Sequence, residues 1–134
     1  MVIVDTSVWI QAFRGIDSDA HHELERLLSE GSVAMVGVVL AELLQGARSR
    51  EEFEELLATL GALPYVAEGP RTWMNVGDLS YGLRRRGLTV GIVDALIATL
   101  AIEHGHQVYT LDEHFQRIPG VKLHVPGAAA ERAE

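Results

Sequence analysis

Short apolar runs alternate with helix-forming segments along the chain, and this alternation limits the possible folds more than any other feature. Strands are predicted at 2–4, 32–36, 63–66, 107–111 and 121–125. Helical patterns occupy 7–14, 17–30, 38–47, 51–60, 70–86, 92–104 and, briefly, 113–117, with Leu57 and Trp73 expected on inward faces. Such an order predicts an α/β fold, in which helices flank both faces of a short, mainly parallel sheet.

Length and composition exclude several classes of protein. A chain of 134 residues predicts one domain, which we place at 1–126, with a flexible tail at 127–134. The absence of cysteine excludes disulfides, thiol catalysis and cysteine-bound zinc. No basic leader precedes the first strand, and no apolar run approaches the roughly 18 residues of a membrane span. We therefore expect a soluble, cytoplasmic protein.

Four carboxylates stand where acidic residues are unexpected. Asp5 and Asp112 follow predicted strands, while Glu42 and Asp94 interrupt the apolar segments VGVVLAELL and GIVDALIATLA. Ligands of parallel sheets bind beyond the carboxyl ends of the strands, so we expect these side chains around one mouth. Clustered carboxylates repel one another and are costly to bury. A hard divalent cation such as Mg²⁺ or Mn²⁺ would offset both effects.

Each acid alone also has a purely structural interpretation. An Asp after a strand commonly caps the next helix, although we assign that cap to Thr6 or Ser7. Glu42 could lie at the edge of a buried helix face. Asp94 is favoured at a helix N-terminus by the helix dipole. The four acids taken together favour a functional site.

In its motifs the chain resembles the PIN-domain ribonucleases, specifically the VapC-type toxins of type II toxin–antitoxin pairs. The matching segments are VIVDTSVWI, VVLAELLQGA, GIVDALIATLA and VYTLDEHFQRIPGV, which lie in the family's order and cover nearly the whole chain. The resemblance implies a PIN-like three-layer sandwich and one or two Mg²⁺ or Mn²⁺ ions. It assigns metal binding and catalysis to Asp5, Glu42, Asp94 and Asp112, with supporting roles for Thr6, Ser7 and Thr110.

The activity and the partners also follow from the resemblance. It implies an endoribonuclease that hydrolyses RNA to leave a 3′-hydroxyl and a 5′-phosphate, and that forms a homodimer. A cognate antitoxin is expected to lay a helix or an extended segment over an apolar groove and to place a cation near the acidic mouth. Thr6 and Ser7 compete for one supporting role, and the sequence leaves the RNA target open.

The overall charge of −8 is unusual for a protein that binds nucleic acid, but the four suspect acids supply half of it. Ten of the eleven basic residues are arginines, whose planar head groups suit phosphate. Arg84, Arg85 and Arg86 end a predicted helix, where cations suit the dipole, and RNA contact is the second interpretation. Arg14, Arg48 and Arg50 are expected on the surface or at the mouth.

Three rival classes remain. A haloacid-dehalogenase-type phosphatase needs a second Asp two residues after the first, but Ser7 stands there. A receiver domain needs a cluster of acids and a Lys after a late strand, but Lys122 is the sole lysine and the chain lacks a second Asp adjacent to a first. A non-catalytic PIN-like interaction module would be expected to have lost some of the four acids, all of which are present.

Overall fold

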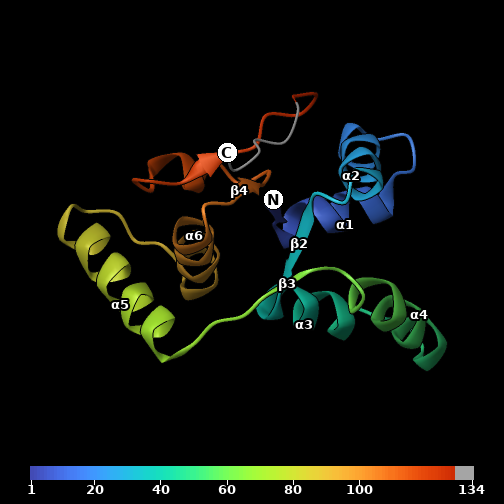
Figure 1. The fold of residues 1–134 in the computed structure, drawn as a ribbon, viewed down its shortest axis with the longest axis horizontal. Helices are drawn as coiled ribbons and strands as arrows, with labels where there is room; N and C mark the ends of the chain where they lie inside the picture. The colour runs from blue at the N-terminus through green and yellow to red at the C-terminus, as the bar shows by residue number, and fades with distance from the viewer. Residues whose placement is uncertain (129–134) are drawn as a thin grey trace.

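A computed structural model describes residues 1–128 as a five-stranded sheet between two layers of helices (Figure 1). The strands are β1 (Val2–Val4), β2 (Val33–Val36), β3 (Tyr65–Val66), β4 (Gln107–Tyr109) and β5 (Lys122–Leu123). They lie in the order β3-β2-β1-β4-β5, and every pairing is parallel. The α/β fold predicted from the alternating pattern is therefore confirmed.

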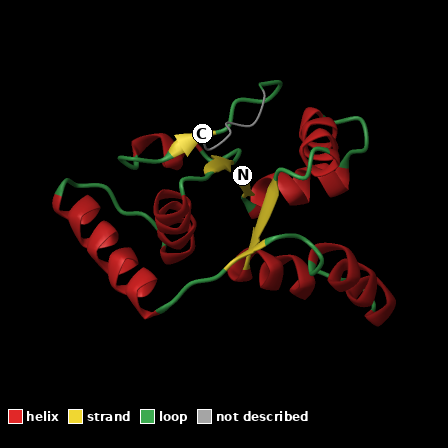
Figure 2. Cartoon of the chain, in the orientation of Figure 1, coloured by secondary structure: helices red, strands yellow, loops and turns green. Residues whose placement is uncertain are grey.

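The helices divide between the two faces of the sheet (Figure 2). One layer holds α1 (Thr6–Arg14), α2 (Asp19–Ser29), α3 (Gly37–Gln45) and α4 (Arg50–Leu60), and the other holds α5 (Pro70–Arg85) and α6 (Ile92–His104). A short 3₁₀ helix, η1 (Glu113–Arg117), joins β4 to β5. Because parallel crossovers are right-handed, reversing direction across the sheet after β3 moves the connecting helices to the opposite face.

The direction of chain progression reverses between β1 and β4, which makes their carboxyl ends a topological switch point. Val4 pairs with Tyr109, and the backbone N–H of Asp5 donates to the Tyr109 carbonyl at 2.8 Å. The residues that follow the two strands are therefore neighbours. Open parallel sheets bind ligands in the crevice at such a point.

Residues buried on all sides explain the continuous apolar runs. Val2, Ile3 and Val4 are at most 1% exposed, because helices cover both faces of β1. In α6, all seven residues from 95 to 101 are buried. Burying one large aliphatic side chain contributes roughly 1.5–3 kcal/mol, so this central layer supplies much of the stability. Among residues 1–128, none of the helices is long and apolar enough to span a bilayer.

Two residues that were expected on the inward faces of their helices are exposed to solvent instead. Trp73 is 48% exposed and Leu57 is 40% exposed. Both belong to helices at the periphery: α5 packs mainly on α6, and α4 mainly on α3. Only a narrow stripe of each helix is covered, and it contains Val76 and Leu83 of α5 and Leu60 of α4. Helical periodicity identifies an apolar side, but it does not give the width of the neighbour that covers it.

A buried ion network fixes the segment after β5 against α2. The His124 ring is nearly inaccessible, and its Nε2 lies 2.6 Å from Glu23 Oε2. Arg26 donates to both Glu23 oxygens at 2.8 Å, and the Gly127 N–H donates to Oε2 at 3.1 Å. Residues 127–128 of the predicted tail thus contact α2, and its positions 129–134 lie outside the described residues.

This network predicts a specific dependence of stability on pH. Hydrogen bonds from Arg26, then from His124 and Gly127, outweigh burial and lower the pKa of Glu23 from 4.5 to about 2. Ionised Glu23 therefore stabilises the fold fully above pH 4.5, and this contribution is lost as the pH falls towards 2. Glu23→Gln should lower the free energy of unfolding at pH 7 by about 2 kcal/mol.

Urea denaturation at pH 7 and at pH 3 measures the effect, with Glu25→Gln, an exposed neighbour on α2, as the matched control. The loss in Glu23→Gln should shrink at pH 3, while Glu25→Gln should resemble the natural protein at both values. An equal loss at both pH values would show that the charge of Glu23 does not stabilise the fold.

Candidate active site

Asp5 lies at the centre of a buried hydrogen-bond network at the end of β1. It is 7% exposed and is itself the N-cap of α1, which corrects the expectation of a Thr6 or Ser7 cap. Oδ1 accepts from the Thr6 N–H at 2.9 Å, and Oδ2 accepts hydroxyl hydrogen bonds from Ser7 at 2.8 Å and Thr110 at 2.9 Å. A carboxylate has about four acceptor positions, so one remains for a ligand.

The three hydroxyl groups near Asp5 have different partners. Ser7 Oγ accepts from the Leu111 N–H at 3.2 Å, and Thr110 Oγ1 accepts from the Asp112 N–H at 2.9 Å. These backbone donors leave both hydroxyl hydrogens free to point at Asp5. Thr6 Oγ1 instead donates to Glu42 Oε1 at 2.9 Å. In this structure Thr6 and Ser7 therefore do not compete: each orients a different carboxylate.

The remaining acids converge on the same mouth from three other elements. Glu42 comes from α3, Asp94 from the first turn of α6, and Asp112 from the N-cap of η1, and all three are half-buried. Burial raises the pKa of Asp94, and the negative charges of Asp5, Asp112 and Glu42 raise it further. The structure thus brings together the four acids that the sequence singled out.

The donor set suits a divalent cation. Four carboxylates offer hard oxygen ligands, and their repulsion at Asp94 is the kind of strain that a bound cation relieves. A second observation concerns His114, which sequence reasoning missed. One ligand atom each from Asp94, Asp112 and His114 lies within 4.8 Å of the other two. The available signal was the Asp-x-His spacing at the end of β4.

A cleft of about 730 Å³ opens beside Glu42. Arg14 and Arg48 line it together with Phe13, so two of the three arginines expected at the surface or mouth flank the acidic site. Arg50 lies outside the cleft lining, with its guanidinium 3.7 Å from Glu54 on the exposed surface of α4. The cleft beside the acidic mouth therefore carries both signs of charge, with Arg48 Nε 3.6 Å from Glu52 and Arg14 on the same lining.

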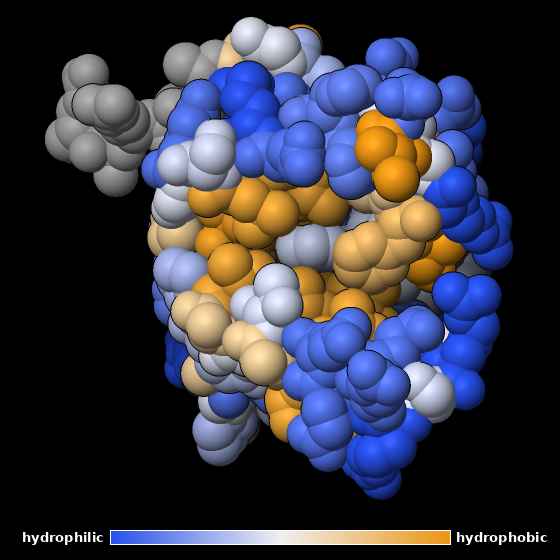
Figure 3. Space-filling model, turned by 90° about the vertical axis from the view of Figure 1, so that its right-hand side faces the viewer, coloured by the Kyte–Doolittle hydropathy of each residue, from blue (hydrophilic) through white to orange (hydrophobic). Residues whose placement is uncertain are grey.

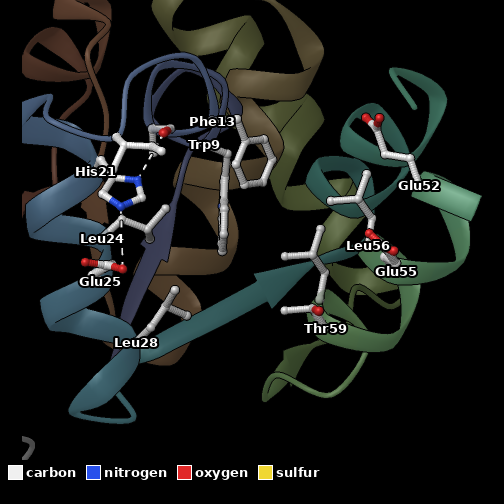
Figure 4. A pocket seen from close by; sticks show the side chains of 13 residues that line it. Trp9, Phe13, His21, Leu24, Glu25, Leu28, Glu52, Glu55, Leu56 and Thr59 are labelled. Carbon is white, nitrogen blue, oxygen red and sulfur yellow. Dashed lines mark hydrogen bonds and ion pairs between the residues drawn. The ribbon is translucent and has the colours of Figure 1, made fainter. Parts of the chain in front are cut away.

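An apolar groove continues from that cleft between α1, α2 and α4. Figure 3 views the side of the molecule where these helices lie and shows a hollowed hydrophobic area bordered by hydrophilic residues. The groove holds about 470 Å³. Trp9 and Phe13 of α1 lie between Leu24 and Leu28 of α2 and Leu56 of α4 (Figure 4). Acidic side chains at its border are Glu25, Glu52 and Glu55.

Comparison with known proteins agrees with this geometry. The PIN domain family model matches residues 2–121. VapC ribonuclease Mb1587 of Mycobacterium bovis is 34% identical over 122 residues, 88% of this chain and 91% of that protein. Ribonuclease VapC21 of Mycobacterium tuberculosis is 32% identical over 117 residues, 82% of each chain. The crystal structure of VapBC2 from Rickettsia felis, bound to a DNA fragment from their promoter, gives a TM-score of 0.76 at 26% identity, covering 92% of this chain and 98% of that one.

The fold and its acidic mouth define a PIN-domain protein. Within that class, the chain belongs to the VapC ribonuclease family, as 34% identity over 88% of its length shows. The three-layer PIN-like sandwich expected from the motifs is confirmed.

Repulsion among the acids predicts a stability gain on neutralising one of them. In chelator at pH 7, Asp94→Asn should raise the melting temperature by a few degrees, because the amide neither repels Asp5 and Asp112 nor loses hydration as a charge does. Asp78→Asn on the exposed face of α5 is the matched control.

Thermal melts with and without Mg²⁺ test this. Added Mg²⁺ should stabilise the natural protein more than Asp94→Asn, since a ligand that binds only the folded state raises its stability. Destabilisation by Asp94→Asn in chelator would contradict the repulsion account.

Proposed function

We propose that the chain is a metal-dependent endoribonuclease toxin whose Asp5, Glu42, Asp94 and Asp112 hold one or two Mg²⁺ or Mn²⁺ ions. The observation that supports this most is the raised pKa of Asp94, caused by burial and by the three other carboxylates. Relatives named ribonucleases, such as VapC ribonuclease Mb1587 and Ribonuclease VapC21, support RNA as the substrate.

The residues divide the work of phosphodiester hydrolysis among them. A divalent cation held by these four carboxylates would activate the attacking water and neutralise charge on the phosphate. Ser7 and Thr110 hold Asp5 in a fixed orientation, and Thr6 holds Glu42, so that the ligands need little rearrangement. Arg14 and Arg48 lie where flanking phosphates of an RNA strand could contact them.

The rival functions lack such support. Position 7 carries a serine whose hydroxyl donates to Asp5 at 2.8 Å, where a phosphatase of the haloacid-dehalogenase type would have its second Asp. A non-catalytic interaction module would not require four acids to converge, together with three hydroxyls that orient two of them. Failure to bind Mn²⁺ by calorimetry would favour the interaction module over the nuclease.

Cleavage of RNA should require both the cation and Asp5. Excess chelator should abolish cleavage of total RNA, and Mg²⁺ or Mn²⁺ should restore it. Asp5→Asn should reduce the rate by more than about 100-fold, and Ser7→Ala by about 10–100-fold, the range typical of residues that orient metal ligands. Ser29→Ala, a substitution on exposed α2 surface, is the matched control. Full activity in chelator, or in folded Asp5→Asn, would contradict the proposed mechanism.

We also propose that the apolar groove binds the cognate antitoxin. The VapBC-5 structure from Mycobacterium tuberculosis, described as a member of the VapBC family of toxin–antitoxin systems and 26% identical to this chain, supports such a pair. A partner segment with an apolar face could cover Phe13, Leu28 and Leu56, and basic side chains of that segment could meet the acidic border. Phe13, Glu52 and Leu56 line both the groove and the cleft beside Glu42, so one bound segment could reach the acidic mouth.

Phe13 offers a test of the groove, because it is 54% exposed and its removal should leave the core intact. Phe13→Ala should weaken binding of the purified cognate antitoxin by at least tenfold, about 1.4 kcal/mol. Tyr65→Ala, which removes an aromatic of similar exposure from outside both cavities, should bind normally. Equal affinity for Phe13→Ala and the natural protein would place the antitoxin elsewhere.

The homodimer and the cytoplasmic location remain predictions, and light scattering at micromolar concentration tests the dimer.

A further inference from the structure

His114 is the one histidine beside the acidic mouth within the described part of the chain, and the four-acid mechanism does not use it. It is the second residue of η1, and Asp112 caps that helix by accepting from the His114 N–H at 2.9 Å. The ring Nδ1 lies 3.2 Å from the same Asp112 oxygen. Two contacts with one carboxylate therefore hold the imidazole at the mouth.

The distances suit a shared ion. A ring nitrogen of His114 and one oxygen each of Asp94 and Asp112 lie within 4.8 Å of one another. Ligands of one small divalent cation, bound at about 2.1 Å, lie at most about 4.2 Å apart. Small side-chain rotations are enough to close that difference, because the His114 side chain is 62% exposed and unobstructed by core packing.

We propose that His114 is an additional ligand of the catalytic cation and that it shifts the preference of the site from Mg²⁺ towards Mn²⁺. The four carboxylates offer only oxygen, which suits both ions. An imidazole nitrogen is a softer ligand, which a transition metal such as Mn²⁺ accepts more readily than Mg²⁺ does. The inference rests on the proposed function, since it assumes that the acidic mouth binds a divalent cation.

The histidine pair next to β4 provides a contrast. His104 ends α6, whereas Asp94 lies in its first turn, so ten residues, or about 15 Å of helix, separate the two. His104 is exposed, and its ring stacks on that of His106. His104→Ala therefore removes an imidazole without touching the mouth and is the matched control.

Calorimetric titration of the full chain with Mn²⁺ alone and with Mg²⁺ alone tests the proposal. His114→Ala should weaken Mn²⁺ binding by at least about tenfold and Mg²⁺ binding by much less, while His104→Ala should change neither. His114→Asp supplies an oxygen ligand in place of nitrogen, so it should retain cation binding but with a lower ratio of Mn²⁺ to Mg²⁺ affinity. Thermal melts in chelator confirm that each variant is folded.

The outcomes separate the two levels of inference. Equal weakening for both ions in His114→Ala would indicate that the His114 ring only orients Asp112, and would overturn the proposal. Unchanged affinity for both ions would overturn it as well. If the natural protein binds neither ion, the metal-dependent function fails and the role of His114 fails with it. If the natural protein binds both ions while the ratio is insensitive to His114, only the further inference fails.

Discussion

Mutual repulsion among carboxylates at the carboxyl edge of a parallel sheet is the constraint on which the rest of the structure depends. The register between β1 and β4 makes Asp5 and Thr110 neighbours, and α3 and α6 add Glu42 and Asp94 from the two sides. The protein offsets part of the cost locally, through three hydrogen bonds to Asp5 and one to Glu42. The remaining imbalance, felt at Asp94, is the chemical basis for a divalent cation at this mouth.

The order of elements and the position of the acids were predictable from local patterns. The limits of α6 at 92–104 and of β1 at 2–4 agree with prediction, because Gly105 at φ +68° ends the helix and Asp5 ends the strand. Strands β3 and β5 are shorter than expected, at two residues each. Strand length depends on how far a neighbour extends, and both lie at the edges of the sheet, with one neighbour each.

The fine structure of the site could not be read from sequence. Thr6 and Ser7 are equally plausible partners for Asp5 until the first turn of α1 directs one hydroxyl to α3 and the other back to β1. The position of His114 depends on η1 being a 3₁₀ turn that returns the ring to its own cap, Asp112. The prediction that Trp73 and Leu57 face inward was wrong for a related reason. The exposure of a residue on a peripheral helix depends on which other elements pack against that helix. Local pattern thus predicts which residues gather at the mouth, but not which atoms meet.

The distribution of charge over this face of the protein suits two different ligands, an RNA strand and an inhibiting protein segment. The mouth is acidic, the cleft beside Glu42 carries Arg14 and Arg48, and the apolar groove is bordered by Glu25, Glu52 and Glu55. An RNA strand would be repelled by the border of the groove and attracted to the arginines of the cleft. A basic, apolar protein segment would show the opposite preference along the groove and would meet RNA only at the mouth. RNA and such a segment would thus prefer different parts of one continuous surface. Both would still occupy the acidic mouth, so only one of them could bind at a time.

Anomalous X-ray diffraction from crystals soaked in Mn²⁺ tests most directly whether the four carboxylates form one cation site. We expect an anomalous peak bounded by Asp5, Asp94 and Asp112, with Glu42 directed at the same centre, and we expect the peak to disappear in crystals of Asp5→Asn. A well-ordered acidic mouth without any anomalous peak at saturating Mn²⁺, or a peak confined to another part of the molecule, would contradict the account.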